Sequence, residues 1–182
     1  VLIHPGFHKT GTTWLQQQVF SDTRAFHMLF DHEEIDRLFI RPHDLVFSAG
    51  DTAREVTAAR SPANSPLIDV ISSETLSGEM FTGSRLSNVV AQRLAETCGP
   101  AKILLTVRSQ LAVTRSIYIQ YLKRGGGLSI EDFLGYRPEP NYGWFNVDVI
   151  HYGRLARRYG KLFGHDNVLV LPQELMAADR KA

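Results

Sequence analysis

The sequence predicts an α/β fold in which a central parallel sheet of about four to five strands is flanked by helices. Two observations lead to this prediction. Short apolar runs alternate with longer segments whose apolar residues recur at helical spacing, which is the pattern of strand–helix–strand units. The apolar runs are nearly continuous, as in strands that are covered on both faces. Because such sheets bind ligands at the carboxyl ends of their strands, function is expected in the residues that follow each strand.

In the first half of the chain, turn and cap residues mark the ends of the expected elements. The first apolar run ends at Pro5-Gly6, a pair that breaks regular structure. Asp51 and Thr52 are suited to cap the helix that they open. The elements expected in this half are strand Val1–His4, helix Thr12–Phe20, strand Ala25–Phe30, helices Glu33–Phe39 and Asp51–Arg60, and strand Leu67–Ser72.

In the second half, glycine and serine set the boundaries. Gly99-Pro100 stops one helix, Gly125–Gly127 closes the next, and Ser129 caps a short one with Asp132 three residues later. An aromatic loop, Arg137–Asn146, is either a hinged lid or an ordinary packed loop. The elements expected in this half are helix Gly83–Cys98, strand Ala101–Val107, helices Ser109–Lys123, Ser129–Leu134 and Trp144–Tyr159, and strand Asn167–Leu171.

Length and charge narrow the possible functions. The 182 residues suit one domain, and 20 Lys+Arg against 19 Asp+Glu give a net charge of +1. That balance argues against nucleic-acid binding but permits a local anion site. A single cysteine, Cys98, excludes an internal disulfide, and the seven histidines show no metal-ligand spacing, so no metal is predicted. No apolar run is long enough to predict a membrane span.

The loop after the first strand has the composition of an anion cradle. Between Pro5 and Trp14 it carries two glycines, three threonines and one lysine, in the order His8, Lys9, Thr10, Gly11, Thr12, Thr13. Glycine lets the backbone approach an oxyanion, N–H groups and threonine hydroxyls donate to it, and Lys9 adds a full charge. The alternative is an ordinary turn. A Walker A motif is excluded, because Lys9 precedes Gly11 instead of following it.

This loop resembles the 5′-phosphosulfate loop of sulfotransferases, usually written P-K-[ST]-G-T-T-[WL]. The resemblance implies a P-loop-type three-layer sandwich and the co-substrate 3′-phosphoadenosine 5′-phosphosulfate (PAPS), with 3′-phosphoadenosine 5′-phosphate (PAP) as product. It implies that His8, Lys9, Thr10, Gly11, Thr12 and Thr13 bind the phosphosulfate and that Trp14 stacks on adenine; packing in the core is the alternative for Trp14. Gly6-Phe7-His8 departs from the usual form, in which Pro stands nearer to Lys.

A second stretch matches the same family. The strand that includes Ile103–Val107 ends at Arg108, and Ser116 follows eight residues later. In sulfotransferases an arginine and a serine at this spacing are implied to bind the 3′-phosphate, for which a guanidinium offers a two-pronged donor. The alternative makes Arg108 a surface cation and Ser116 a helix filler.

Sulfuryl transfer to a hydroxyl also needs a base and charge neutralisation. Lys9 suits neutralisation of the leaving phosphate. Glu74 follows the strand Leu67–Ser72, and a carboxylate at such a strand end faces the cleft, so we predict Glu74 as the general base. The rival bases are His8, His32 and His43, and Glu74 is alternatively an acid with electrostatic value only.

Together these features predict a PAPS-dependent O-sulfotransferase that acts on a small-molecule or carbohydrate acceptor, without metal or nucleic acid. A glycan, a glycolipid, a phenol and a small alcohol all stay open as acceptors. The alternatives are a P-loop small-molecule kinase and a non-catalytic domain that binds a nucleotide or glycan. The resemblance runs from Gly6 to Glu174, so we expect residues 1–182 to form one such domain without the family's later helix and basic loop. A cytoplasmic, bacterial protein is expected.

Overall fold

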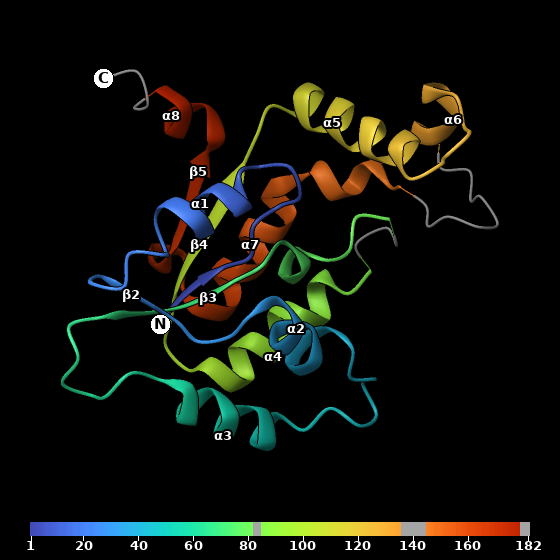
Figure 1. Cartoon of the computed structure of the whole chain (residues 1–182). Helices are drawn as coiled ribbons and strands as arrows, with labels where there is room; N and C mark the ends of the chain where they lie inside the picture. Colours follow the sequence, from blue (N-terminus) through green and yellow to red (C-terminus); the bar gives the residue numbers. More distant parts are fainter. Residues whose placement is uncertain (82–84, 136–144, 179–182) are drawn as a thin grey trace.

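The computed structural model covers the whole chain and describes residues 1–81, 85–135 and 145–178 (Figure 1). The beginnings of two expected helices, at Gly83 and Trp144, lie outside the described residues. The same holds for residues 137–144 of the expected aromatic loop.

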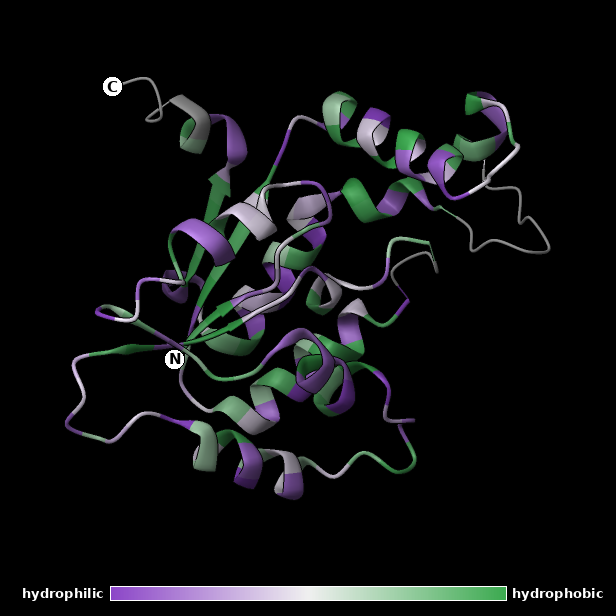
Figure 2. Cartoon of the chain, in the orientation of Figure 1, coloured by the Kyte–Doolittle hydropathy of each residue, from purple (hydrophilic) through white to green (hydrophobic). Residues whose placement is uncertain are grey.

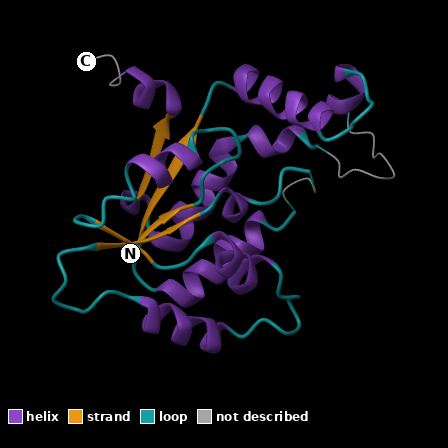
Figure 3. Ribbon diagram, viewed as in Figure 1, coloured by secondary structure: helices purple, strands orange, loops and turns teal. Residues whose placement is uncertain are grey.

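A parallel sheet forms the centre of the molecule (Figure 3). Its strands run in the order β2-β3-β1-β4-β5, and every neighbouring pair is parallel. The first strand therefore lies in the middle, with Leu2 opposite Val70 on one side and Lys102 on the other. The strands are β1 (Leu2–His4), β2 (Phe26–Met28), β3 (Ile68–Ser72), β4 (Lys102–Val107) and β5 (Val168–Pro172). This architecture confirms the predicted fold class.

Helices cover both faces of this sheet. The helices of the described residues are α1 (Thr12–Gln18), α2 (His32–Ile35), α3 (Ala49–Ala59), α4 (Ser87–Cys98), α5 (Gln110–Lys123), α6 (Ile130–Leu134), α7 (Tyr152–Phe163) and α8 (Gln173–Ala178). Short turns of other helix types span Asp36–Ile40, Glu74–Ser77, Val147–Ile150 and His165–Asn167. Most of the sheet is hydrophobic in Figure 2, and its central strands β1, β3 and β4 carry the fully buried residues.

The core is divided among three clusters of buried side chains. The largest packs Ile71 and Leu105 of the sheet against α3, α4 and α7. A second, smaller cluster around Leu15 of α1 covers the opposite face. The third lies beyond the strand ends, where Ile117 of α5 and Phe133 of α6 pack together. The third cluster holds α5 above the carboxyl ends of the strands, as Figure 1 shows.

Among the element boundaries that differ from the prediction, two are helix starts where the observed cap explains the difference. Helix α3 begins at Ala49, because Ser48 supplies the cap by accepting the N–H of Asp51 (3.3 Å); the predicted caps Asp51 and Thr52 lie inside the helix. Helix α7 begins only at Tyr152, because Asn146 accepts the N–H of Asp148 (2.8 Å) and starts a separate 3₁₀ turn. The predicted cap of α6 is confirmed, since Ser129 accepts the N–H of Asp132 at 3.1 Å. None of the described helices has the length and hydropathy needed to cross a membrane.

Candidate active site

The loop that leaves β1 bends sharply before α1. Its backbone enters the left-handed region twice, at Lys9 (φ 65°) and at Gly11 (φ 95°). Glycine adopts this conformation without strain, whereas for lysine it is strained. Strained residues of this kind concentrate at functional sites. The bend leaves the Lys9 side chain exposed at the mouth of a cavity.

A buried polar network holds this loop to the sheet. His4, at the end of β1, is hydrogen-bonded through Nδ1 to Ser72 Oγ (2.8 Å) and through Nε2 to Thr106 Oγ1 (3.2 Å). Thr106 in turn shares a hydrogen bond with Thr10 Oγ1 (2.8 Å), which donates to the carbonyl of Phe7 (2.6 Å). Burial lowers the pKa of His4 to about 4, so the imidazole is neutral and serves one neighbour as donor and the other as acceptor.

The loop forms one wall of a cavity of about 270 Å³ at the carboxyl ends of the strands. Two of the residues predicted for catalysis, Lys9 and Glu74, line it together. Predicted loop residues His8, Gly11, Thr12 and Thr13 line it as well, and so does the rival base His32. Segments that are distant in the sequence thus meet at one site because the ends of β1 and β3 are adjacent in the sheet.

Thr12 carries a polar atom that the protein leaves unused. Its side chain is buried, and Oγ1 has no hydrogen-bond partner. Gly6 lies directly behind it, where any Cβ would collide with Thr12 Oγ1. A buried hydroxyl without a partner is uncommon, because its desolvation is not compensated. This hydroxyl at the cavity wall fits the sulfate or phosphate oxygens of an anionic ligand. Helix α1 has only seven residues, so the features of this wall that suit an anion are the loop and its side chains, not a helix dipole.

Arg108 follows β4 and lies beside the same loop. Its Nη1 donates to the carbonyl of Lys9 at 3.4 Å. The next residue, Ser109, donates its backbone N–H to the carboxylate of Glu174 (2.9 Å), and this hydrogen bond lowers the pKa of Glu174. Glu174 therefore orders the segment that carries Arg108. Ser116 is half-buried on α5 and does not line the cavity.

The candidate bases differ in position. Glu74 opens the 3₁₀ turn after β3 and lines the cavity. His32 is hydrogen-bonded to Ser73 Oγ (3.2 Å), and His8 donates from Nε2 to the carbonyl of Gly78 (3.0 Å). His43 lies in an exposed loop, where its Nδ1 accepts the N–H of Leu45 (3.2 Å). His43 is not part of the cavity wall, so its prediction as a rival base is not supported by the geometry.

Two residues predicted to bind the co-substrate have other surroundings. The Thr10 hydroxyl points inward and is used to hold the loop, so only its backbone is available to a ligand. Trp14 is half-buried and packs against the cluster around Leu15 and Phe20 instead of lining the cavity. This position is compatible with the core-packing alternative, and stacking of Trp14 on adenine stays a prediction.

The cavity also contains residues that sequence reasoning missed. Gln120 reaches it from α5, Arg124 from the C-cap of that helix, and Glu79 from the segment after the 3₁₀ turn. Ser116, Gln120 and Arg124 are spaced four residues apart, which places them along one stripe of the helix. That spacing was visible in the sequence and pointed from the predicted Ser116 to the two missed residues. The Gln120 Oε1 atom is buried without a hydrogen-bond partner, a second polar atom that a ligand can satisfy. No group of three or more potential metal ligands occurs among the residues that the structure describes.

Comparison with known proteins places this geometry in a structural class. No protein-family model matches the chain, and no curated protein matches it. Among solved structures, a sulfotransferase from Alicyclobacillus acidocaldarius resembles it with a TM-score of 0.54 and 19% sequence identity. The match covers 98% of this chain and 75% of that chain. The fold is therefore sulfotransferase-like, with the cavity at the carboxyl ends of its parallel strands.

Proposed function

We propose that the protein is a PAPS-dependent O-sulfotransferase. The observation that carries the proposal is the meeting of Lys9, Glu74 and the unpartnered Thr12 hydroxyl in one cavity. A cation, a base and an unused donor at the ends of neighbouring strands are the groups that sulfuryl transfer to a hydroxyl requires. The sulfotransferase-like fold supports the same reaction class. We take residues 1–182 as one unit of this fold.

In the proposed mechanism, the loop after β1 holds the phosphosulfate. Lys9 contributes a full positive charge, and Thr12 and Thr13 contribute hydroxyl donors from the cavity wall. As the bond between sulfur and the bridging phosphate oxygen breaks, its electron pair stays on that oxygen, and Lys9 neutralises the charge that develops there. The network of His4, Thr10 and Thr106 keeps the loop in this shape before the co-substrate binds.

Glu74 acts as the base in this proposal. Its carboxylate takes the proton of the acceptor hydroxyl while the acceptor oxygen forms its bond to sulfur on the side opposite the leaving phosphate. His32 lines the same cavity and is the rival for this role. The acceptor is a hydroxyl compound such as a glycan, a glycolipid or a small alcohol.

Arg108 and Ser116 bind the 3′-phosphate in this proposal. The contact between Arg108 and the Lys9 carbonyl places the guanidinium beside the phosphosulfate loop, and a guanidinium suits two-pronged binding of a phosphate. Binding of the 3′-phosphate by Arg108 and Ser116 would distinguish PAPS from nucleotides without a 3′-phosphate.

Calorimetric titration with PAP and with AMP tests the proposal. We expect PAP to bind at least about tenfold more tightly than AMP, because a charge-assisted contact to the 3′-phosphate is absent in AMP. The Arg108→Gln variant should lose this preference, whereas Arg115→Gln, which removes an exposed charge from α5, should keep it. Equal affinities of the wild-type protein for PAP and AMP would contradict the assignment.

Turnover is tested separately with PAPS labelled in its sulfate and a panel of glycans, glycolipids and alcohols. Transfer of label to an acceptor supports the enzyme assignment. Tight PAP binding without transfer to any member of the panel would support a non-catalytic nucleotide-binding protein instead.

A further inference from the structure

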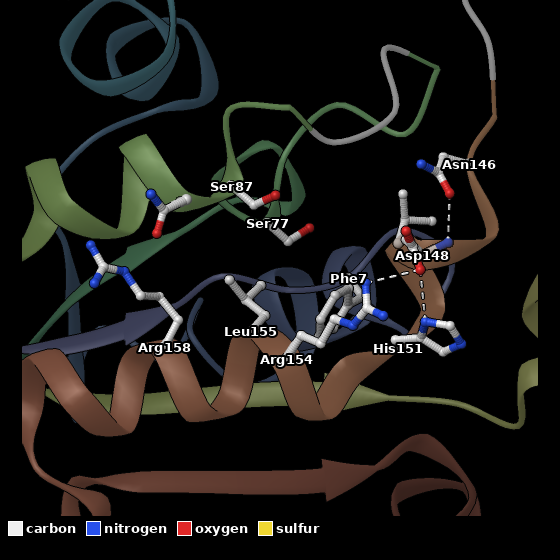
Figure 4. Close-up of a pocket in the computed structure, with 11 residues that line it drawn as sticks. Phe7, Ser77, Ser87, Asn146, Asp148, His151, Arg154, Leu155 and Arg158 are labelled. Atoms are coloured by element: carbon white, nitrogen blue, oxygen red, sulfur yellow. Dashed lines mark hydrogen bonds and ion pairs between the residues drawn. The ribbon is translucent and has the colours of Figure 1, made fainter.

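Figure 4 shows the residues that line a second cavity, of about 390 Å³. Some of its lining residues are close in the chain to residues that line the first cavity. The two share a wall made of two chain segments. In one segment, Phe7 lines the second cavity and the adjacent His8 lines the first. In the other segment, Ser77 lines the second cavity and Glu74 lines the first. The hydrogen bond from His8 to the carbonyl of Gly78 joins the two segments. The 3₁₀ turn Glu74–Ser77 thus presents residues to both cavities.

The second cavity is lined by arginines from one side. Arg154 and Arg158 are one helical turn apart on α7, and Figure 4 shows their side chains rising from this helix. Arg154 pairs with Asp148 (2.9 Å), which also contacts His151 (3.0 Å). Among the described residues, the lining therefore holds two guanidiniums against one carboxylate. A net positive lining favours an anion.

Arg158 is held in place by a hydrogen bond, but not all of its donors have a partner. Its Nη2 donates to Gln92 Oε1 of α4 at 2.7 Å. Its Nε is buried and has no hydrogen-bond partner. An unsatisfied buried donor is costly, so the side chain is placed for more than packing. Fixed guanidiniums of this kind are suited to carboxylate, sulfate and phosphate groups, because their planar donors match two oxygens at once.

The N-termini of two long helices, α4 and α7, add to the positive charge of this cavity. Helix α4 begins at Ser87 and α7 begins at Tyr152, next to cavity residues Asn88 and His151. Neither helix has a side-chain hydrogen bond at its N-cap, and neither has an acidic residue in its first turn. The partial positive charge of both N-termini is therefore not offset by an acid of the same helix.

We propose that this second cavity binds an anionic group of the acceptor, a carboxylate, sulfate ester or phosphate ester. The inference rests on the proposed function, since it assigns the charge class of that reaction's acceptor. An acceptor long enough to reach across the wall between the cavities places one hydroxyl beside Glu74 and its anionic group beside Arg154 and Arg158. Neutral alcohols lack the group that this cavity recognises and bind more weakly.

The experiment compares two disaccharides that differ in a single carboxylate, cellobiose and cellobiouronic acid. Their dissociation constants are measured by NMR titration of the isotope-labelled, PAP-saturated protein at low ionic strength. We expect the acid to bind about tenfold more tightly, the gain of one charge-assisted contact. Arg154→Gln should reduce this preference, and the double variant with Arg158→Gln should abolish it.

Arg157→Gln is the matched control, because Arg157 is an exposed arginine of the same helix that does not line the second cavity. This variant should keep the preference for the acid. Since Arg158 also links α7 to α4, the single Arg154→Gln variant provides a reading in a protein that retains that link. Equal affinities for the two disaccharides, binding of neither, or an unchanged preference in the double variant would overturn the inference. The same titration without PAP separates this inference from the proposed function: a wild-type protein that does not bind PAP but still prefers the acid would contradict the proposed function alone.

Discussion

The imidazole of His4 lies 2.8 Å from the hydroxyl of Ser72, its register partner on the neighbouring strand β3. On its other side the same ring reaches Thr106 of β4 (3.2 Å). One side chain of the central strand therefore ties together the ends of three strands below the loop that follows β1. The tie depends on the neutral form of the ring, because a protonated imidazole has no acceptor nitrogen and is poorly solvated in the core.

This dependence predicts that the protein loses stability in mild acid. The pKa of His4 is lowered from 6.5 to about 4, so the unfolded state holds more protons than the native state between those values. Stability then rises with pH across that window and falls as the pH drops through it, by on the order of 3 kcal/mol in total. Urea unfolding at a series of pH values measures the effect. In His4→Gln this part of the pH dependence should disappear, and an unchanged profile would contradict it.

A second prediction concerns Thr10, one of two buried threonines in the loop after β1. Its hydroxyl donates to the carbonyl of Phe7 (2.6 Å) and is bonded to Thr106 (2.8 Å). Thr10→Val leaves both partners buried without it, so we expect the free energy of unfolding to fall by about 1–3 kcal/mol. Urea unfolding at neutral pH measures the loss. A Thr10→Ser variant, which keeps the hydroxyl, should recover most of it, and equal losses in both variants would assign the effect to packing.

Local signals predicted the parts of the molecule that are contiguous in sequence. The apolar runs predicted the strands because the apolar residues of each strand are consecutive in sequence. The glycines, threonines and lysine of the loop from Pro5 to Trp14 likewise lie in a single stretch. The His4 network was not predicted, because Ser72 and Thr106 meet it only through the order and register of the strands. Element ends were missed where a residue outside the periodic pattern supplied the cap, as Ser48 does for α3.

The residues of α5 show the same limit at the site. Ser116 was predicted from a resemblance, whereas Gln120 and Arg124 line the cavity. Which turn of α5 reaches the loop is set by its packing on Phe133 and the rest of the third cluster. That packing joins segments that are separate in sequence. The helical stripe was therefore predictable, but which of its residues line the cavity was not. Trp14 was ambiguous for a related reason, since stacking and core packing require the same residue type.

A third prediction assigns the base. Glu74→Gln keeps the shape of the side chain but removes its ability to take a proton, so we expect kcat for sulfuryl transfer to fall about 10²–10⁴-fold. PAP affinity should stay unchanged. Label transfer from PAPS to the best acceptor of the panel gives the rate, and calorimetry gives the affinity. His32→Asn is the comparison, because His32 lines the same cavity. A larger loss in His32→Asn than in Glu74→Gln would transfer the role to the histidine.

The last prediction concerns Thr12, whose hydroxyl is buried without a partner in the free protein. Thr12→Val removes that hydroxyl at nearly constant volume, and because no hydrogen bond is lost, the free energy of unfolding should stay the same or increase. The affinity for PAP should fall about tenfold if the hydroxyl donates to the bound 5′-phosphate. The pattern is the reverse of Thr10→Val, which lowers stability through a hydroxyl that does not face the cavity. Measuring unfolding and PAP binding on both variants separates the roles, and a Thr12→Val protein that is less stable but binds PAP normally would assign Thr12 to the scaffold.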